Sequence, residues 1–160
     1  MAQKSYIDEL DSRFIKATKK LRLADAEELL NRGANIDAVD RKGMTALIYA
    51  ARGGNLKVTE FLVRFGAALD IQDHLGFTAA MYSAYHRRPK VAKYLVDSGA
   101  NLTLNNTKGQ TAHDIAIEKK YRDIAVMFPE IDLTATLKRG VDALVRLHRG
   151  IKEPNKLKVV

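Results

Sequence analysis

The stretch Gly43-Met44-Thr45-Ala46 returns 33 residues later as Gly76-Phe77-Thr78-Ala79 and again as Gly109-Gln110-Thr111-Ala112. A second set keeps the same interval, with Gly-Ala inside Leu30–Asn35, Val63–Ala68 and Val96–Asn101. A third set consists of Asp40, Asp73 and Asn106, each three residues before the first glycine of its unit. Three patterns with one period indicate a repeat architecture.

The chemistry within one unit predicts a turn followed by two helices. Gly43 and its equivalents lie in polar turns, where a left-handed backbone is accessible at little cost without a Cβ atom. Thr45 has the right hydroxyl to accept a backbone N–H at a helix N-terminus. A second helix is predicted from Val58, Phe61, Leu62 and Phe65 at helical spacing, and Gly66 is a suitable C-terminal stop.

These motifs resemble the ankyrin repeat family, whose unit is a β-turn and two antiparallel helices in about 33 residues. The resemblance implies an all-α solenoid of helix-turn-helix units joined by β-turn loops. The expected repeat domain is 1–131, divided into a capping unit at 7–39 and repeats at 40–72, 73–105 and 106–131. A C-terminal amphipathic helix is expected at 132–150, and a mobile basic tail at 151–160.

One departure from the family pattern concerns its Thr-Pro-Leu-His tetrapeptide. Here this tetrapeptide reads Thr45-Ala46-Leu47-Ile48, Thr78-Ala79-Ala80-Met81 and Thr111-Ala112-His113-Asp114, so the proline and the turn-bonding histidine are absent from it. Because alanine favours helix, the fold should survive. A weaker network between the turns is expected.

The composition bounds the function classes. The 160 residues include 27 Lys and Arg against 19 Asp and Glu, which gives a net charge of +8. No cysteine is present, which excludes a disulfide scaffold, a cysteine nucleophile and a zinc finger. No signal-peptide pattern or apolar stretch of membrane-spanning length occurs, so a soluble, cytoplasmic protein is expected, with nuclear or host-cell delivery left open.

Catalytic and metal-binding motifs are not found. The histidines His74, His86, His113 and His148 have no metal-ligand spacing, and no nucleophile elbow or phosphate-binding glycine loop occurs. Asp40 and Asp73 are expected to bond their own turns rather than act as acids or bases. A non-enzyme without a cofactor is therefore predicted, and a monomer is expected.

A concave partner-binding groove is implied by the resemblance, at the turn tips and the exposed ends of the first helices. We expect that the core does not need the apolar side chains of Met44, Leu75 and Phe77, and that they form a cluster of binding hot spots. The alternative is that Met44 and Phe77 fold back against neighbouring turns. The predicted partner-binding residues are Arg41, Lys42, Met44, Arg52, His74, Leu75, Phe77, Tyr85, His86, Lys108, Gln110 and Lys119; Thr107 and Glu118 belong to the same surface.

Cations recur near the predicted loop between the two helices of each unit. Stacking would align them as a basic edge, which either steers acidic partners or serves only as a solvated rim. The edge consists of Lys19, Lys20, Arg22, Arg87, Arg88, Lys90, Lys120 and Arg122.

The favoured function is a protein–protein interaction module for an acidic or mixed acidic-apolar partner. The alternative is binding of nucleic acid or a membrane surface through the basic edge and the C-terminal cations, which include Lys138, Arg139, Arg146 and Arg149. The interleaved aromatics of single-strand binders are missing, which weighs against nucleic acid. The C-terminal helix could also lie on an anionic membrane, although covering the end of the stack uses its apolar side better.

Overall fold

The structure is a computed structural model that describes residues 2–128, with side chains described from residue 8. Within these residues it contains eight α-helices and no strand, which confirms the predicted all-α class. The helices are α1 (Ala2–Lys19), α2 (Leu23–Asn31), α3 (Ala46–Gly53), α4 (Leu56–Arg64), α5 (Ala79–Tyr85), α6 (Pro89–Asp97), α7 (Ala112–Glu118) and α8 (Arg122–Ala125). The predicted helix at 132–150 and the tail at 151–160 lie outside the described residues.

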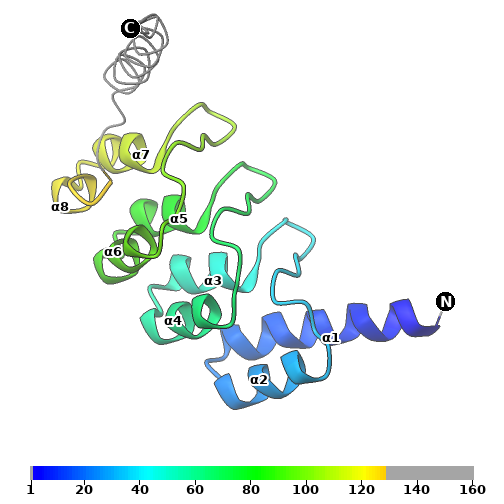
Figure 1. Ribbon diagram of the computed structural model, residues 1–160. Coiled ribbons are helices and arrows are strands. Elements are labelled where there is room, and N and C mark those ends of the chain that lie inside the picture. Colours follow the sequence, from blue (N-terminus) through cyan, green and yellow to red (C-terminus); the bar gives the residue numbers. More distant parts are fainter. Residues whose placement is uncertain (1, 129–160) are drawn as a thin grey trace, which may run out of the picture. The chain divides into compact units, whose positions relative to one another are not determined.

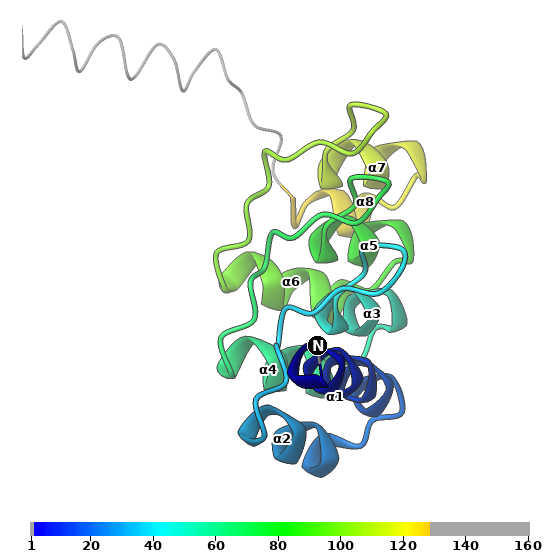
Figure 2. The same ribbon diagram turned by 90° about the vertical axis from the view of Figure 1, so that its right-hand side faces the viewer.

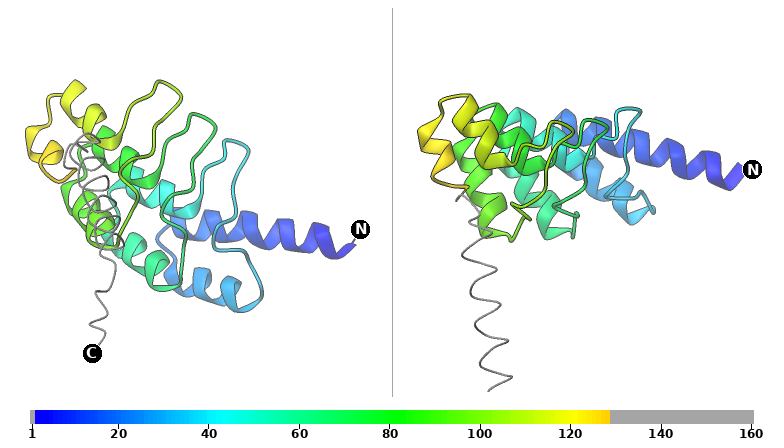
Figure 3. Two further views of the ribbon diagram at one scale, coloured as in Figure 1. Left: turned by 45° about the horizontal axis from the view of Figure 1, so that its top comes forward. Right: turned by 90° about the horizontal axis from the view of Figure 1, so that it is seen from above.

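The helices form antiparallel pairs that stack on one another (Figure 1). The first helices, α1, α3, α5 and α7, contact one another in order and form one layer, while α4, α6 and α8 contact one another in a second layer. A long loop precedes each of α3, α5 and α7, and the three loops project to the same side of the stack (Figures 2 and 3). The predicted solenoid of helix pairs joined by turn loops is therefore confirmed.

The recurring threonines cap the first helices, as predicted. Thr45 Oγ1 accepts the Ile48 N–H, Thr78 Oγ1 accepts the Met81 N–H, and each bond is 3.2 Å long. Thr111 forms a capping box with Asp114, whose carboxylate accepts the Thr111 N–H at 2.9 Å. Each cap satisfies an N–H that the helix itself leaves unpaired, so the end of the turn and the start of the helix are both fixed.

The core combines buried alanines with larger apolar side chains in both layers. Ala51 and Ala84 are fully buried in α3 and α5, where the lack of a larger side chain lets neighbouring helices approach closely. Val58, Leu62 and Leu95 bury the inner sides of α4 and α6. Burial of one such branched side chain stabilises the fold by about 1.5–3 kcal/mol.

Backbone hydrogen bonds join neighbouring turns. The His74 N–H donates to the Lys42 carbonyl at 3.1 Å, and the Thr107 N–H donates to the Leu75 carbonyl at 3.0 Å. The Gln72 amide adds a bridge by donating to the carbonyls of Gly76 at 2.7 Å and Asn105 at 2.8 Å. The bonds expected from the family's histidine are thus replaced by bonds from the backbone and a glutamine.

The loop within each helix pair uses a left-handed residue, which the sequence analysis did not predict. Leu21 (φ 60°), Gly54 (φ 76°), Arg87 (φ 50°) and Lys120 (φ 60°) occupy equivalent positions, again 33 residues apart. Only Gly54 signals this conformation from sequence, because the other side chains adopt it at a cost. In the third unit, Arg88 follows this bend and donates to the Arg52 carbonyl of the preceding unit at 3.3 Å.

Candidate functional site

A groove with a volume of about 690 Å³ lies between the turn tips and the exposed ends of the first helices. Every residue predicted for the partner-binding surface lines it. The lining consists of Arg41, Lys42, Met44, Arg52, Asp73, His74, Leu75, Phe77, Tyr82, Tyr85, His86, Thr107, Lys108, Gln110, Ile115, Glu118 and Lys119. Asp73, Tyr82 and Ile115 were not predicted. Tyr82 and Ile115 follow Tyr49 at the 33-residue interval, but Tyr49 does not line the groove, so the register alone did not point to them.

The apolar residues of the groove differ in exposure. Leu75 is 59% exposed and Tyr85 is 40% exposed, so both offer side-chain surface to a partner. Met44 is only 2% exposed. The expectation that the core does not need Met44 was therefore wrong, since its side chain turns inward and packs among buried residues. Phe77 is half-buried, which matches the alternative reading in part.

An aromatic cluster forms the middle of the groove. The Phe77 ring centroid lies 5.0 Å from that of Tyr82 and 6.1 Å from that of Tyr85. The His86 ring stacks on Tyr82 with centroids 6.1 Å apart and meets Tyr85 edge-on at 5.0 Å. Tilted and edge-on pairs of this kind contribute beyond simple burial. The cluster gives the groove a rigid apolar surface.

Hydrogen bonds to the turn carboxylates hold this cluster in place. Asp73 Oδ1 accepts the N–H groups of Leu75 and Phe77, both at 2.9 Å, and its Oδ2 accepts the Tyr82 hydroxyl at 2.7 Å. Asp40 accepts the Tyr49 hydroxyl in the same way at 2.6 Å. The predicted role of Asp40 and Asp73 as turn-bonding residues is confirmed, and the tyrosine partners are additional.

These bonds shift several pKa values. The bond to Asp40, together with burial, raises the pKa of Tyr49 to about 12. Burial and the bond to Asp73 raise the pKa of Tyr82 above its usual range. Burial would raise the pKa of Asp40, but its bonds from Tyr49, Lys42 and Met44 lower it on balance. The tyrosines therefore stay protonated and Asp40 stays ionised near neutral pH.

The groove carries more positive than negative groups. Its cations are Arg41, Lys42, Arg52, Lys108 and Lys119, and its acids are Asp73 and Glu118. Asp73 is engaged in its turn, and Glu118 accepts a hydrogen bond from the Gln110 amide. The pKa of His86 is lowered by burial and by the charges of Arg52, Arg88 and Lys119, so neutral His86 is favoured. The arrangement suits an anionic segment with an apolar side chain.

The predicted basic edge divides into different environments. All eight of its residues are exposed. Arg87 is engaged with Asp123 at 3.3 Å and lies 5.4 Å from the Tyr121 ring centroid. Lys20 and Arg22 line a hollow between α1 and α2, where Arg22 pairs with Asp25. Lys19 and Arg88 line a third hollow next to the groove.

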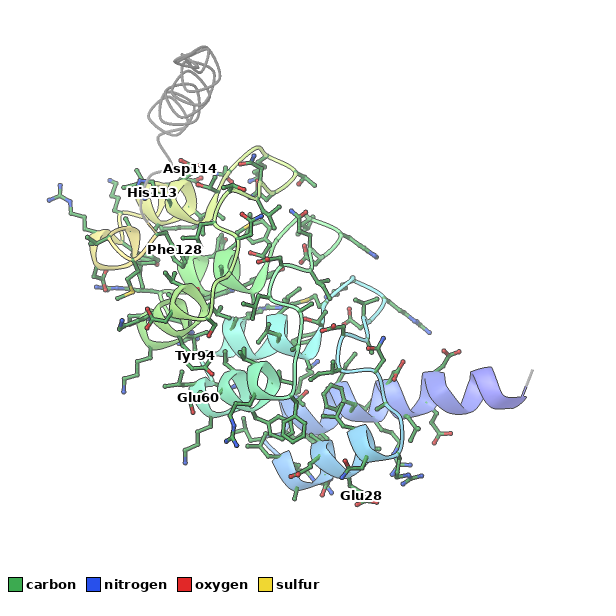
Figure 4. The ribbon with its side chains drawn as sticks, viewed as in Figure 1. Glu28, Glu60, Tyr94, His113, Asp114 and Phe128 are labelled. Atoms are coloured by element: carbon green, nitrogen blue, oxygen red, sulfur yellow. The ribbon has the colours of Figure 1, made fainter. Side chains whose placement is uncertain are left out.

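The rest of the described chain shows no cluster of metal ligands and no membrane-spanning helix. Across residues 2–128, no group of three or more His, Asp or Glu side chains is arranged to hold a metal ion. His113 Nδ1 bonds the Phe128 carbonyl, which joins α7 to the end of the last pair (Figure 4). In the same part of the chain, no helix is both long and apolar enough to cross a membrane.

The sequence matches a known protein family. The family model for ankyrin repeats, in three copies, matches residues 14–106. No curated protein matches the sequence significantly. Ankyrin repeats generally mediate protein–protein interaction, and the family is typically non-enzymatic. With its 33-residue period, capped helix pairs and turn loops, the chain belongs to the ankyrin repeat family.

Proposed function

We propose that this protein binds a partner protein through the groove, and that the bound segment combines acidic residues with an apolar side chain. The observation that carries the proposal is the exposed Leu75 and Tyr85 beside the cations of the groove. Exposed apolar and aromatic groups supply binding energy when they are desolvated at an interface. The surrounding cations favour an acidic segment and speed its association.

Rigidity of the groove supports the same proposal. The aromatic cluster is fixed by the Asp73–Tyr82 bond, and neighbouring turns are joined by backbone bonds. A preformed surface loses little conformational entropy on binding. The volume of about 690 Å³ is enough for a few side chains of an extended or helical segment.

The experiment is capture with the whole chain, followed by affinity measurement on the captured partner once it is identified and purified. We expect Leu75→Ala and Tyr85→Ala to weaken binding about tenfold or more each, as for hot-spot residues. Val39→Ala and Phe65→Ala are matched controls, because Val39 is 55% exposed and Phe65 is 42% exposed but neither lines the groove. Equal losses for groove and control variants would contradict the proposal.

Salt separates this function from sequence-independent binding to nucleic acid or membrane. Binding to phosphate polymers falls steeply with salt, because counterions are released in proportion to the phosphates contacted. Groove binding should keep most of its affinity at high salt, since apolar contacts are not screened, while the association rate falls. A steep loss of affinity, together with unchanged affinity for Leu75→Ala, would favour the alternative.

A further inference from the structure

A hollow of about 400 Å³ is lined by residues of the first, second and third units and lies next to the groove. Its charged lining residues are Lys19, Arg52 and Arg88, neutral His86 lies beside them, and its lining contains neither aspartate nor glutamate. Arg52 and His86 also line the groove, so the two cavities adjoin. By contrast, the hollow between α1 and α2 includes Asp25 and Glu28 in its wall, and the groove includes Asp73 and Glu118.

Several contacts draw these cations together. Arg88 Nε donates to the Arg52 carbonyl at 3.3 Å, which ties the third unit to the second. Gly54 allows this approach, since a Cβ there would lie 2.6 Å from Arg88 Cδ. The Lys19 ammonium lies 3.9 Å from the Tyr49 ring centroid. These contacts fix the side chains of Lys19 and Arg88 beside Arg52, although all three remain exposed to solvent.

Within the described residues, the cations of the cluster form no close ion pair with a carboxylate. No carboxylate there lies within ion-pair distance of Lys19, Arg52 or Arg88. The Tyr49 ring attracts the Lys19 ammonium but carries no net charge, and Asp40 interacts with Lys19 only from beyond ion-pair distance, so the cluster keeps an excess of positive charge. Burial is the main cause of the lowered pKa of His86, and the positive charges of Arg52 and Arg88 lower it further.

We propose that this hollow binds the dianionic phosphate of a phosphorylated side chain in the partner segment. The inference rests on the proposed function, since it adds a second contact for the segment bound in the adjoining groove. Two guanidinium groups match the oxygens of a phosphate, and two negative charges offset the cluster better than the single charge of a carboxylate. Because the hollow opens beside the groove, it favours a peptide phosphate over a lipid headgroup.

The test uses phenyl phosphate with the whole chain at pH 7.5, where this probe is a dianion, and benzoate as the singly charged comparison. Amide chemical shifts in a titration report both the site and the dissociation constant. We expect shifts at Gly53, Asn55 and Arg88, and binding of phenyl phosphate about tenfold tighter than that of benzoate. Equal affinity for the two probes, or shifts located elsewhere, would overturn the proposal.

Charge-removing variants locate the site. Arg52→Gln and Lys19→Gln should each weaken phenyl phosphate binding about fivefold to tenfold. Arg52→Lys should lose less than Arg52→Gln, since it keeps the charge but not the planar fork. Arg64→Gln is the control, because Arg64 is an exposed arginine in the last turn of α4, outside the hollow. An equal loss for Arg64→Gln would mean non-specific attraction and would overturn the proposal.

A vesicle-binding experiment distinguishes a peptide phosphate from the phosphate of a lipid headgroup. Co-sedimentation with phosphatidylcholine vesicles containing phosphatidylinositol bisphosphate should be weak and unaffected by Arg52→Gln. Vesicle binding that depends on Arg52, with no response to phenyl phosphate, would overturn the proposal in favour of a lipid headgroup. The phenyl phosphate titration tests the hollow alone, whereas the partner affinities of Leu75→Ala and Tyr85→Ala test the groove alone. One proposal can therefore fail while the other stands.

Discussion

The turns of the second and third units differ from the turn of the fourth at two linked positions. Asp40 is paired with the Tyr49 hydroxyl and Asp73 with that of Tyr82, whereas the fourth turn has Asn106 and, at the tyrosine position, Ile115. Asn106 Oδ1 still accepts the N–H groups of Lys108 at 2.9 Å and Gln110 at 3.0 Å.

The difference follows from the donors that the next helix supplies. A carboxylate has a second oxygen that needs a donor when it is partly buried, and the tyrosine hydroxyl provides one. Without that hydroxyl, the amide of Asn106 instead donates to Gln110 Oε1 at 3.1 Å. The residue at the base of a turn therefore depends on a residue nine positions later.

The largest expected effect concerns the glycines of the third and fourth turns. Gly76 has φ 73°, and a Cβ there would lie 2.9 Å from Asn106 Cα. Gly109 has φ 76°, but a Cβ there would meet no described atom within 4 Å. Gly76→Ala should cost about 2–5 kcal/mol, from left-handed strain and overpacking together, against about 1–2 kcal/mol for Gly109→Ala.

Urea unfolding of both glycine variants measures this difference. Similar losses of stability for the two variants would mean that the contact between Gly76 and the Asn106 backbone adds nothing to the cost. Both losses would then come from the left-handed backbone conformation alone.

The next largest effect is expected from removing the tyrosine hydroxyl of the Asp73–Tyr82 hydrogen bond. Tyr82→Phe leaves a partly buried oxygen of Asp73 without its donor, which should lower the free energy of unfolding by about 1–2 kcal/mol. Tyr94→Phe is the matched control, since Tyr94 is half-buried on α6 and its hydroxyl has no hydrogen bond within residues 2–128. Its change should stay within about 0.5 kcal/mol. If both variants lost equal stability, the Asp–Tyr bond would not explain the difference between the turns.

The smallest effect is a pH dependence at the base of the turn, where Asp40 titrates and the equivalent Asn106 does not. Because the folded pKa of Asp40 is below its ordinary value of 3.8, the folded state binds fewer protons than the unfolded state. The stability it contributes is complete above pH 3.8 and is lost as the pH falls through the folded pKa.

Urea unfolding measured from about pH 5 to pH 2 checks this sign. Asp40→Asn should remove part of the acid-induced loss, whereas Asn106→Ala should lower stability equally at both ends of the range. A full acid loss in Asp40→Asn would assign the effect to other carboxylates.

Much of the groove could be predicted from sequence because the repeat fixes which positions become equivalent. Leu75, Tyr85 and Arg52 were placed correctly on the cavity wall from their register alone. Met44 was misjudged, because its register is the same as that of Phe77 and Gln110 but its side chain packs inward. The register gives the position of a residue but not its rotamer, and the neighbouring side chains decide the rotamer.

The sequence by itself determined the period, the turn glycines, the threonine caps and the family, since each depends on local backbone chemistry that recurs every 33 residues. Only the tertiary structure decided which cations are neutralised. Arg87 meets Asp123 from the next unit, whereas the Arg88 guanidinium donates to the backbone carbonyl of Arg52 and the Lys19 ammonium lies over the Tyr49 ring. Such partners come from different units, so their distances follow from how the helix pairs stack and not from any local pattern.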